Sequence, residues 1–478
     1  MHRTARVGLH RLTNVQRKRC FGLLRSAADV WSCALELNAW RRQRRDTPLV
    51  SLEALYRELT LAGPGAFGEL DAVGARSVLR RFSDAWFSAA KRRKAGDLTI
   101  RFPRRRRGLM AVRWHHGVFR LQGRRLRLPA ALGCDPLWVQ LDREVPYPAE
   151  QVRSVTLLAD GGRLWVDVTA EVPVATYPDT KRPDPDRVAG VDLGIIHPFA
   201  VAGPEGQALL VSGRAIRAEH RMHLADTKQR RRAVAKRAPM PGRRRSRRWQ
   251  QYRRREQVVQ GRYLRRVRQA MHEAARMVVD WAVEHRIGTL AVGDPRSVLT
   301  IPAGRRHNLR VRNNWRVGQL MAILHDKAEL ADISVRLVNE RGTSSTCPNC
   351  RQHVARPAGR TTICKSCNTI GHRDLFAAAI IATRTPTDAS GGLTTAAAVL
   401  PHVVTHRRAG RHLPGAGLSR RDPRRPHRSS PPSVTTGEAP RGSVGRLWPA
   451  LPTTVGSRSP NPCGEESQSP LKSGLRTR

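Results

Sequence analysis

The sequence contains no apolar run of about 18 residues, the minimum for a membrane-spanning helix. Its opening segment, MHRTARVGLHRL, also lacks the apolar core of a secretory signal peptide. Both absences argue against membrane insertion and secretion, and we expect a cytoplasmic protein. No internal repeat is visible along the 478 residues.

Acidic residues are scarce: 38 Asp and Glu stand against 87 Lys and Arg, a formal net charge of +49. Such a charge repels itself in a compact state unless a polyanion neutralises it. Nucleic acid is the polyanion that fits best, and the lack of apolar runs disfavours its rival, an acidic membrane surface. With 40% hydrophobic residues the chain can still bury a sizeable core.

Cysteines are few, and half of them form two CxxC pairs. The scattered four are Cys20, Cys33, Cys134 and Cys463. The paired four are Cys347, Cys350, Cys364 and Cys367, with thirteen residues between the two pairs. This spacing predicts two knuckles around one tetrahedral zinc ion rather than a disulfide framework. Four thiolates would close the coordination sphere, which makes the zinc structural; the alternative is a degenerate knuckle without metal.

Three kinds of apolar pattern follow one another along the chain. Residues 13 to 94 place apolar side chains at helical spacing. Residues 98 to 173 consist of short alternating runs separated by glycine-bearing turns, which predicts a small β-barrel or sandwich. From residue 188 three strands follow in close succession, which predicts an antiparallel meander, and the order continues with helix, strand, helix, strand and a final helix. This is the element order of an RNase H-like α/β fold. From about Asp388 the chain is rich in Pro, Ser, Gly and Arg, and we expect disorder.

Two aspartates are candidate metal ligands. Asp192 ends an apolar strand, where a carboxylate is poorly solvated unless it meets a cation. The alternative is an aspartate that caps its own turn. Asp374 begins the alanine-rich helix DLFAAAII, where an N-terminal aspartate is also a common cap.

A two-metal phosphodiester site needs a third carboxylate from a separate element. The fourth strand ends in Gly293-Asp294, without the expected glutamate. Glu340 ends the fifth strand, and its longer side chain could reach the vacant place because Gly293 leaves room. Asp294 is the alternative, although an offset of one residue turns its side chain to the other face. Glu340 could also be a surface residue beside Arg341.

Basic runs interleave arginine with aromatic residues in two places, residues 101 to 108 and 228 to 255. This mixture favours phosphate contact and base stacking over a merely solvated charged face. The candidate nucleic-acid-binding residues are Arg104, Arg105, Arg106, Arg107, Arg244, Arg245, Arg247, Arg248 and Trp249.

Taken together, VDLG, VGD, NERGTSSTCPNC, CKSC and HRDLFAAA resemble the TnpB proteins of bacterial insertion sequences, relatives of type V CRISPR effectors. The resemblance covers about residues 1 to 388, and the cysteine knuckle ahead of a basic-Asp helix is its most specific part. It implies an RNA-guided DNA endonuclease that binds a guide RNA from its own locus and a double-stranded DNA target beside a short flanking motif. Such a bacterial protein would associate with the nucleoid when bound to DNA.

The resemblance also implies roles for residues. Asp192, Glu340 and Asp374 would be the catalytic set and would hold magnesium, and the four cysteines would hold zinc. Many family members carry the middle acid at or beside the position of Gly293, whereas a subset with VGD uses a glutamate before the TS-TC motif, as Glu340 stands here. This subset fits the sequence, and we therefore expect an active nuclease. The expected catalytic ions are two Mg²⁺.

The same resemblance divides the chain. The expected parts are a first wedge strand (1–12), a helical REC-like lobe (13–95), a β-rich wedge domain (96–180), a RuvC-like nuclease domain (181–346 and 368–388), a zinc-binding insertion (347–367) and a disordered basic tail (389–478). The sequence does not distinguish a monomer from a dimer.

Two other functions compete with the guided nuclease. One is an RNA-guided repressor or transposition accessory protein that binds without cutting, and retention of all three acids argues against it. The other is a transposase that performs strand transfer itself. Only five tyrosines exist and none has a recognisable catalytic context, which disfavours a tyrosine nucleophile.

Overall fold

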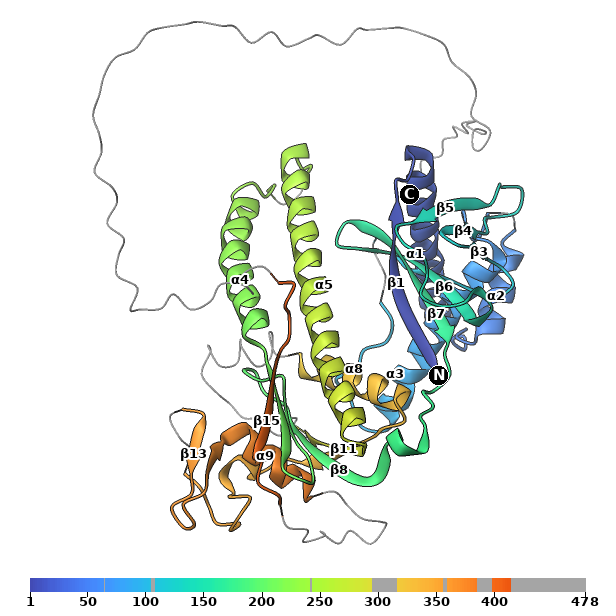
Figure 1. The fold of residues 1–478 in the computed structure, drawn as a ribbon. Coiled ribbons are helices and arrows are strands. Elements are labelled where there is room, and N and C mark those ends of the chain that lie inside the picture. Colours follow the sequence, from blue (N-terminus) through green and yellow to red (C-terminus); the bar gives the residue numbers. More distant parts are fainter. Residues whose placement is uncertain are drawn as a thin grey trace, which may run out of the picture. The chain divides into compact units, whose positions relative to one another are not determined.

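The computed structural model describes residues 1–63, 65–104, 108–240, 243–294, 316–355, 359–384 and 398–413. Arg105, Arg106 and Arg107, three of the predicted nucleic-acid contacts, lie outside these ranges, and so does the expected tail beyond residue 413. Two main sheets organise the described residues (Figure 1). The result is a mixed α/β fold. Within these ranges no helix combines the length and the apolar character needed to cross a membrane.

The first helices follow one N-terminal strand. The elements are β1 (His2–His10), α1 (Asn14–Gln43), α2 (Leu52–Leu61) and α3 (Ala72–Lys94). Thr13 begins α1 with a capping box, in which its side chain and that of Gln16 each accept a hydrogen bond from the other's backbone. Helices α1 and α3 share a core in which the rings of Trp31 and Phe82 meet edge to face at 5.2 Å.

The first sheet has seven strands in the order β2-β6-β7-β1-β5-β4-β3. Its other members are β2 (Val112–His115), β3 (Arg120–Gln122), β4 (Arg125–Leu128), β5 (Leu137–Leu141), β6 (Val152–Asp160) and β7 (Arg163–Glu171), with short 3-10 turns η1 (Ala149–Gln151) and η2 (Asp179–Lys181). Alternate residues of β7 are buried, as the alternating sequence predicts. Strand β1 lies in the middle of the sheet, although it is the first element of the chain.

The second sheet has six strands in the order β12-β11-β8-β9-β10-β15. They are β8 (Asp184–Asp192), β9 (Phe199–Ala202), β10 (Gln207–Ser212), β11 (Ile287–Asp294), β12 (Ser334–Asn339) and β15 (Val403–Arg408). Strands β8, β9 and β10 form the expected antiparallel meander, and β11 and β12 run parallel to β8. The meander and the place of β12 beside β11 agree with the expectation from the sequence.

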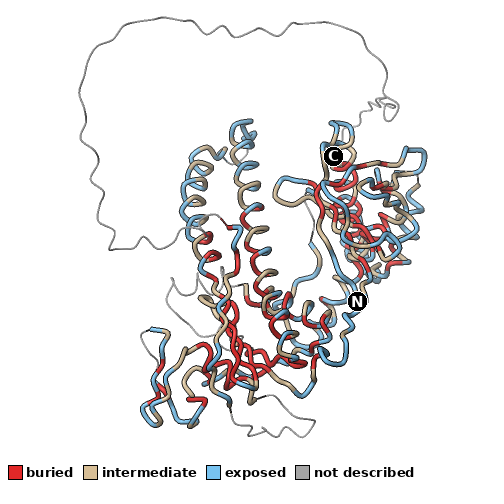
Figure 2. The backbone as a smooth tube through the Cα atoms, in the orientation of Figure 1, coloured by how far each residue is buried: buried red, intermediate tan, exposed pale blue. Residues whose placement is uncertain are grey.

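Helices pack on this sheet according to side-chain alternation. They are α4 (Arg214–Ala235), α5 (Arg247–Glu284), α8 (Val317–Leu330) and α9 (Arg373–Ala382). Val191 and Val292 belong to the same core cluster as the buried residues of α5 and α8, whereas Ala291 packs with Ile381 of α9. The buried residues of α5 begin at Gly261 and continue toward its C-terminal end (Figure 2). The first half of α5 is exposed and rich in arginine.

A glycine allows α9 to approach the sheet. A Cβ at Gly190 would lie 1.9 Å from the backbone oxygen of Ala378 and 2.5 Å from the nitrogen of Ala382. The alanines of α9 complete this close contact, with Ala378 fully buried. The side chains at the carboxyl ends of β8, β11 and β12 on this face therefore lie near the first turn of α9.

Strand β15 contradicts the expectation that order ends at residue 388. It pairs in parallel with β10 over six residues, from Gln207↔Val403 to Ser212↔Arg408. Ala409 and Leu413 then join the main core, at 0% and 5% exposure. Sequence composition missed the strand because VVTHRR is short and polar in its second half, which suits an edge position. The expected zinc-binding insertion also extends further, through the hairpin β13 (Thr361–Ile363) and β14 (Ile370–His372).

Candidate functional site

Three elements bring the predicted acids to the face of the sheet that α9 covers. Asp192 is the last residue of β8, two positions after Gly190, which touches α9. Glu340 directly follows β12, two positions after Val338, which packs against Ile381 of α9. Asp374 lies in the first turn of α9 and is only 6% exposed.

Gly293 provides the space that Glu340 occupies. A Cβ at Gly293 would lie 2.9 Å from Oε2 of Glu340 and 3.2 Å from its Cβ. Gly293 pairs with Val338 across the two strands, while Asp294 pairs with Asn339. Because side chains alternate along a strand, Asp294 begins on the opposite face from Gly293. Glu340 therefore fills the place beside Gly293, and Asp294 stays close enough for its charge to raise the pKa of Glu340.

Two of the three carboxyl groups hold their protons strongly. Burial, together with the charges of Asp374 and Glu340, raises the pKa of Asp192 to about 8. Burial, with the charge of Asp294, raises the pKa of Glu340 to about 7. Carboxylates that repel one another in a partly buried space are the usual setting of a cation site.

At Asp374 the neighbouring donors and positive charges outweigh the effect of burial on the pKa. Burial by itself would raise the pKa of Asp374, but a hydrogen bond from His197 and the charge of Arg360 lower it to about 2. The His197 Nδ1 lies 2.8 Å from Oδ2, and the Arg360 Nη1 donates to Oδ1 at 2.8 Å and to Oδ2 at 3.1 Å. Arg373 adds a third contact at 3.5 Å. Asp374 is therefore ionised and held in one orientation.

The sequence did not identify His197 as a site residue, and His372 appeared only within the motif HRDLFAAA. The rings of the two histidines meet edge to face at 5.0 Å, and His372 accepts a hydrogen bond from the backbone of Asp374. The ligand atoms of His197, His372 and Asp374 all lie within 4.8 Å of one another. The described oxygens of Asp192, Glu340 and Asp374 do not form such a group. Only the turn position of His197, after the first aspartate, could have signalled its role.

The donor set fits a hard divalent cation. Carboxylate oxygens are the ligands that Mg²⁺ prefers. Asp192 and Glu340 would lose their protons to such an ion, because a nearby positive charge favours the ionised form. The residues present thus suit Mg²⁺ chemically.

The four paired cysteines converge on one point. The Sγ atoms of Cys347 and Cys367 lie 3.7 Å apart, and those of Cys350 and Cys364 lie 3.5 Å apart. All four Sγ atoms are within 4.8 Å of one another. A tetrahedral zinc ion with bonds of about 2.3 Å requires sulfur atoms about 3.8 Å apart. The cluster could therefore hold zinc with little movement.

Both CxxC pairs end in the same backbone turn. The residues after the second cysteines, Arg351 and Asn368, have positive φ angles of 62° and 56°. In each turn the following amide donates to the carbonyl of the first cysteine, Arg351 to Cys347 and Asn368 to Cys364. A hydrogen bond with the Thr369 hydroxyl lowers the pKa of Cys367 to about 6, which favours the thiolate that zinc binds.

The cysteine cluster is connected to Asp374 through the hairpin of β13 and β14. Arg360 precedes β13 and donates to the Asp374 carboxylate, while its own carbonyl accepts from the backbone of Arg373. A Cβ at Gly371 would collide with the ring of Phe376, so the hairpin packs directly on α9. The hairpin beside the cysteine cluster therefore positions the Arg360 guanidinium next to Asp374.

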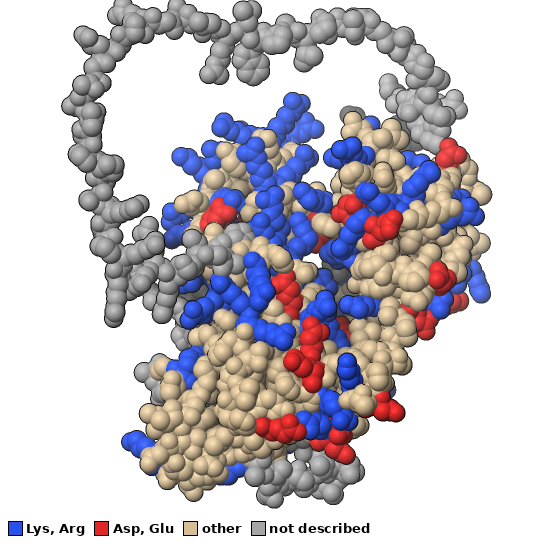
Figure 3. All heavy atoms as spheres, in the orientation of Figure 1, with Lys and Arg blue, Asp and Glu red and all other residues tan. Residues whose placement is uncertain are grey.

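The predicted basic residues lie in two places. Arg244, Arg245, Arg247 and Arg248 are exposed at the start of α5 and just before it. Trp249 lies between two guanidinium groups, Arg245 at 5.4 Å and Arg253 at 5.6 Å from its ring. Figure 3 shows basic side chains gathered over this end of α4 and α5. The backbone of Arg104, by contrast, accepts a hydrogen bond from Trp31.

Two family models match the sequence. Residues 171–299 match a probable transposase, OrfB_IS605, and residues 318–381 match the Cas12f1-like TNB domain. The second match spans the helix α8, the cysteine cluster and most of α9. No curated protein sequence matches the chain.

Solved structures resemble the fold at low sequence identity. A cryo-EM structure of a Cas12f1-sgRNA-target DNA complex is 13% identical, with a TM-score of 0.51 over 77% of this chain and 82% of that one. A structure of the mini-RNA-guided endonuclease CRISPR-Cas_phi3 is 10% identical, with a TM-score of 0.45 over 80% and 92%. The mixed α/β fold described above is therefore shared with a Cas12f1 protein.

Proposed function

We propose that this chain is a TnpB-like, RNA-guided DNA endonuclease of a mobile element, which its two family-model matches support. It would hydrolyse DNA phosphodiester bonds at a target matched by the guide and flanked by a short motif. The observation that carries this proposal is that Asp192, Glu340 and Asp374 come from three separate elements on the side of the sheet that α9 covers, where the charges of Glu340 and Asp374 raise the pKa of Asp192.

The nuclease part would be a RuvC-like domain built on the six-stranded sheet. Mg²⁺ ions held by the three carboxylates would stabilise charge on the scissile phosphate and activate the attacking water. Asp192 and Glu340, protonated without a cation, would ionise as the ions bind. His197 and Arg360 would keep Asp374 ionised and oriented through their contacts with its carboxylate.

Guide RNA and double-stranded DNA are the proposed partners. The Cas12f1 protein of similar fold was solved with a guide RNA and target DNA. This chain carries the charge for such partners, +49 overall, with exposed arginines and Trp249 at the start of α5. Base pairing would select the target, while the protein would read shape and the flanking motif.

A repressor that binds target DNA without cutting it is the alternative function. All three acids are present, and the environments of Asp192 and Glu340 favour cation binding, which supports a nuclease over this alternative.

The test is a cleavage assay on the full chain co-expressed with the RNA of its native locus. The substrate is a plasmid with a matching target and a randomised flank, in Mg²⁺ or in EDTA, and Asp374→Ala is the control variant. Cutting confined to Mg²⁺, to certain flanks and to the unaltered chain supports the proposal. RNA-dependent target binding without cutting overturns it in favour of the repressor.

A further inference from the structure

The seven-stranded sheet contains a cavity of about 360 Å³ at the point where β1 changes partner. Gly8 of β1 pairs with Trp165 of β7, and the next residue, Leu9, pairs with Leu141 of β5. The start of α1 and the β6–β7 turn complete the cavity wall, including the ring of Phe21. The cavity thus has a fixed frame of three strands and one helix.

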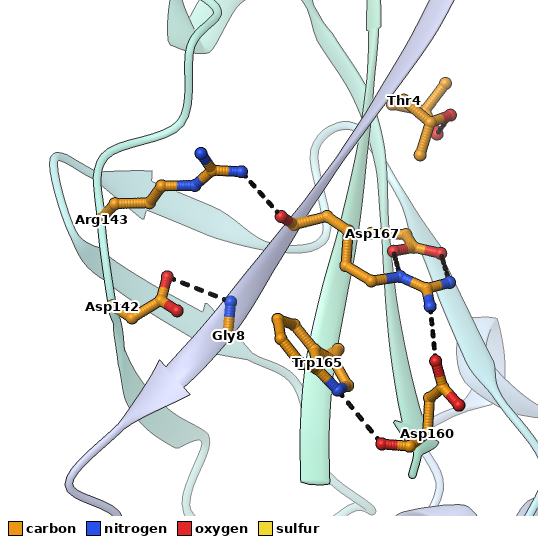
Figure 4. Close-up of polar contacts among 9 residues, drawn as sticks. Thr4, Gly8, Asp142, Arg143, Asp160, Trp165 and Asp167 are labelled. Carbon is orange, nitrogen blue, oxygen red and sulfur yellow. Dashed lines mark hydrogen bonds and ion pairs between the residues drawn. The ribbon is translucent and has the colours of Figure 1, made fainter. Parts of the chain in front are cut away.

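Gly8 lets a carboxylate and an indole approach each other. A Cβ at Gly8 would lie 2.5 Å from Oδ2 of Asp142 and 3.4 Å from the ring of Trp165. Asp142 accepts a hydrogen bond from the backbone of Gly8 through Oδ1, and Trp165 donates to the carbonyl of Asp160 (Figure 4). Among the described residues no donor meets Oδ2 of Asp142, so this oxygen can accept a hydrogen bond from a ligand.

Three arginines line the same cavity: Arg11, Arg17 and Arg163. All three are exposed, and in the described part of the chain none has a carboxylate partner. Nearby Arg6 differs, because Asp167 and Asp160 bind its guanidinium at 2.6 Å and 3.0 Å. The cavity therefore combines uncompensated positive charge with one acceptor.

Arg11 is held at the rim by an unusual backbone. Its φ angle is 38°, in the left-handed region that non-glycine residues seldom adopt. This turn connects the end of β1 to the cap of α1 at Thr13. Strained residues of this kind concentrate at binding sites, where the surrounding structure maintains them.

We propose that this cavity binds one unpaired nucleotide whose base carries an amino group. The arginines would contact the phosphate, Phe21 and Trp165 would supply the stacking surface, and Asp142 would accept a hydrogen bond from the amino group of cytosine, adenine or guanine. Uracil and thymine lack that amino group. The inference rests on the proposed function only in taking nucleic acid as the partner, and it requires neither cutting nor a guide.

The test measures binding of the full chain to single-stranded eight-nucleotide probes of one base, with and without Mg²⁺. Ribose and deoxyribose probes of C, A and U or T distinguish an RNA source of the nucleotide from a DNA source. The variants are Asp142→Asn, Arg163→Ala and Arg11→Gly, the last of which keeps the positive φ available. Arg120→Ala is the control, because Arg120 is likewise an exposed arginine that begins a strand of this sheet, outside the cavity lining.

We expect the unaltered chain to bind C and A probes more tightly than U or T probes. Arg163→Ala and Arg11→Gly should weaken the C and A probes about tenfold, the scale of one lost nucleotide contact, while Arg120→Ala should change them little. Asp142→Asn should remove most of the preference between bases without unfolding the chain. Equal losses in Arg163→Ala and Arg120→Ala, or no base preference in the unaltered chain, overturn the proposal. Failure to cut DNA leaves these outcomes unaffected.

Discussion

The Glu340 carboxylate lies where a side chain at Gly293 would begin, 2.9 Å from the position of the missing Cβ. The fourth strand therefore lacks an acid but provides room for one from its neighbour. Val338 pairs with Gly293, and Glu340 stands two residues further along the same face.

Gly293→Ala should reduce guided cleavage about a hundredfold, because even a displacement of 1 Å or less in a catalytic group is costly. The added methyl group would displace Glu340 or Ile381. Gly318→Ala is the matched control, since a Cβ there meets nothing within 4 Å. Cleavage rates and melting temperatures of both variants check this. Normal cutting by Gly293→Ala would show that Glu340 does not need this place.

Glu340→Ala should abolish Mg²⁺-dependent cleavage and leave guide-RNA binding unchanged, because Glu340 shares a face with the other acids. Asp294→Ala should retain cutting, since the residue begins on the opposite face. Cleavage and RNA-binding assays on both variants decide between the two acids. The reverse result would assign the third carboxylate to Asp294.

The metal-free chain should lose stability as pH rises from 5.5 to 8.5. The pKa values of Asp192 and Glu340 in the folded chain, about 8 and about 7, exceed their ordinary values of 3.8 and 4.5. A group with a raised pKa stabilises the fold fully at low pH, and that contribution disappears as pH passes the folded-state value. The lowered pKa of Asp374, about 2, acts only in stronger acid.

Melting temperatures in EDTA across this pH range measure the effect. Asp192→Asn should flatten the slope, whereas Asp186→Asn, an exposed position on the same strand, should not. Mg²⁺ should restore stability most at the high end of the range. An unchanged slope in Asp192→Asn would contradict the assigned cause.

Cys364→Ser should release zinc and lower the melting temperature by at least about 5 °C, because four thiolates secure this segment. Cleavage should fall as well, since the β13–β14 hairpin holds Arg360 on Asp374. Native mass spectrometry gives the zinc content, with one ion per chain expected. Cys134→Ser, which changes an exposed cysteine outside the cluster, serves as the control. Full zinc content in Cys364→Ser would refute the assignment.

A chain that ends at Asp388 should be less stable than one that ends at Leu413. Only the longer chain keeps β15 and the buried side chains of Ala409 and Leu413. Leu413→Ala in the full chain should cost about 2 kcal/mol or more in free energy of unfolding. Denaturant unfolding of the two truncated chains, the Leu413→Ala variant and the unaltered full chain measures these differences. Equal stability of the two truncated chains would mean that β15 contributes nothing to the core.

The sequence by itself determined the periodic elements and the metal ligands that lie close together along the chain. Apolar alternation and helical spacing predicted the meander of β8, β9 and β10 and the helices on it, because these patterns report burial directly. The spacing of the four cysteines predicted their convergence, since both knuckles are local turns. Motifs and charge together pointed to a TnpB-like protein that binds nucleic acid.

Only the tertiary structure decided which distant side chains meet. Gly293 and Glu340, or His197 and Asp374, are far apart in sequence, and strand register and helix packing alone bring them into contact. The sequence did not predict the edge strand β15, because its residues are few and partly polar and show no strand pattern. The strand forms through its hydrogen bonds with β10. Local patterns encode burial, whereas a site depends on contacts between elements whose pairing no local pattern records.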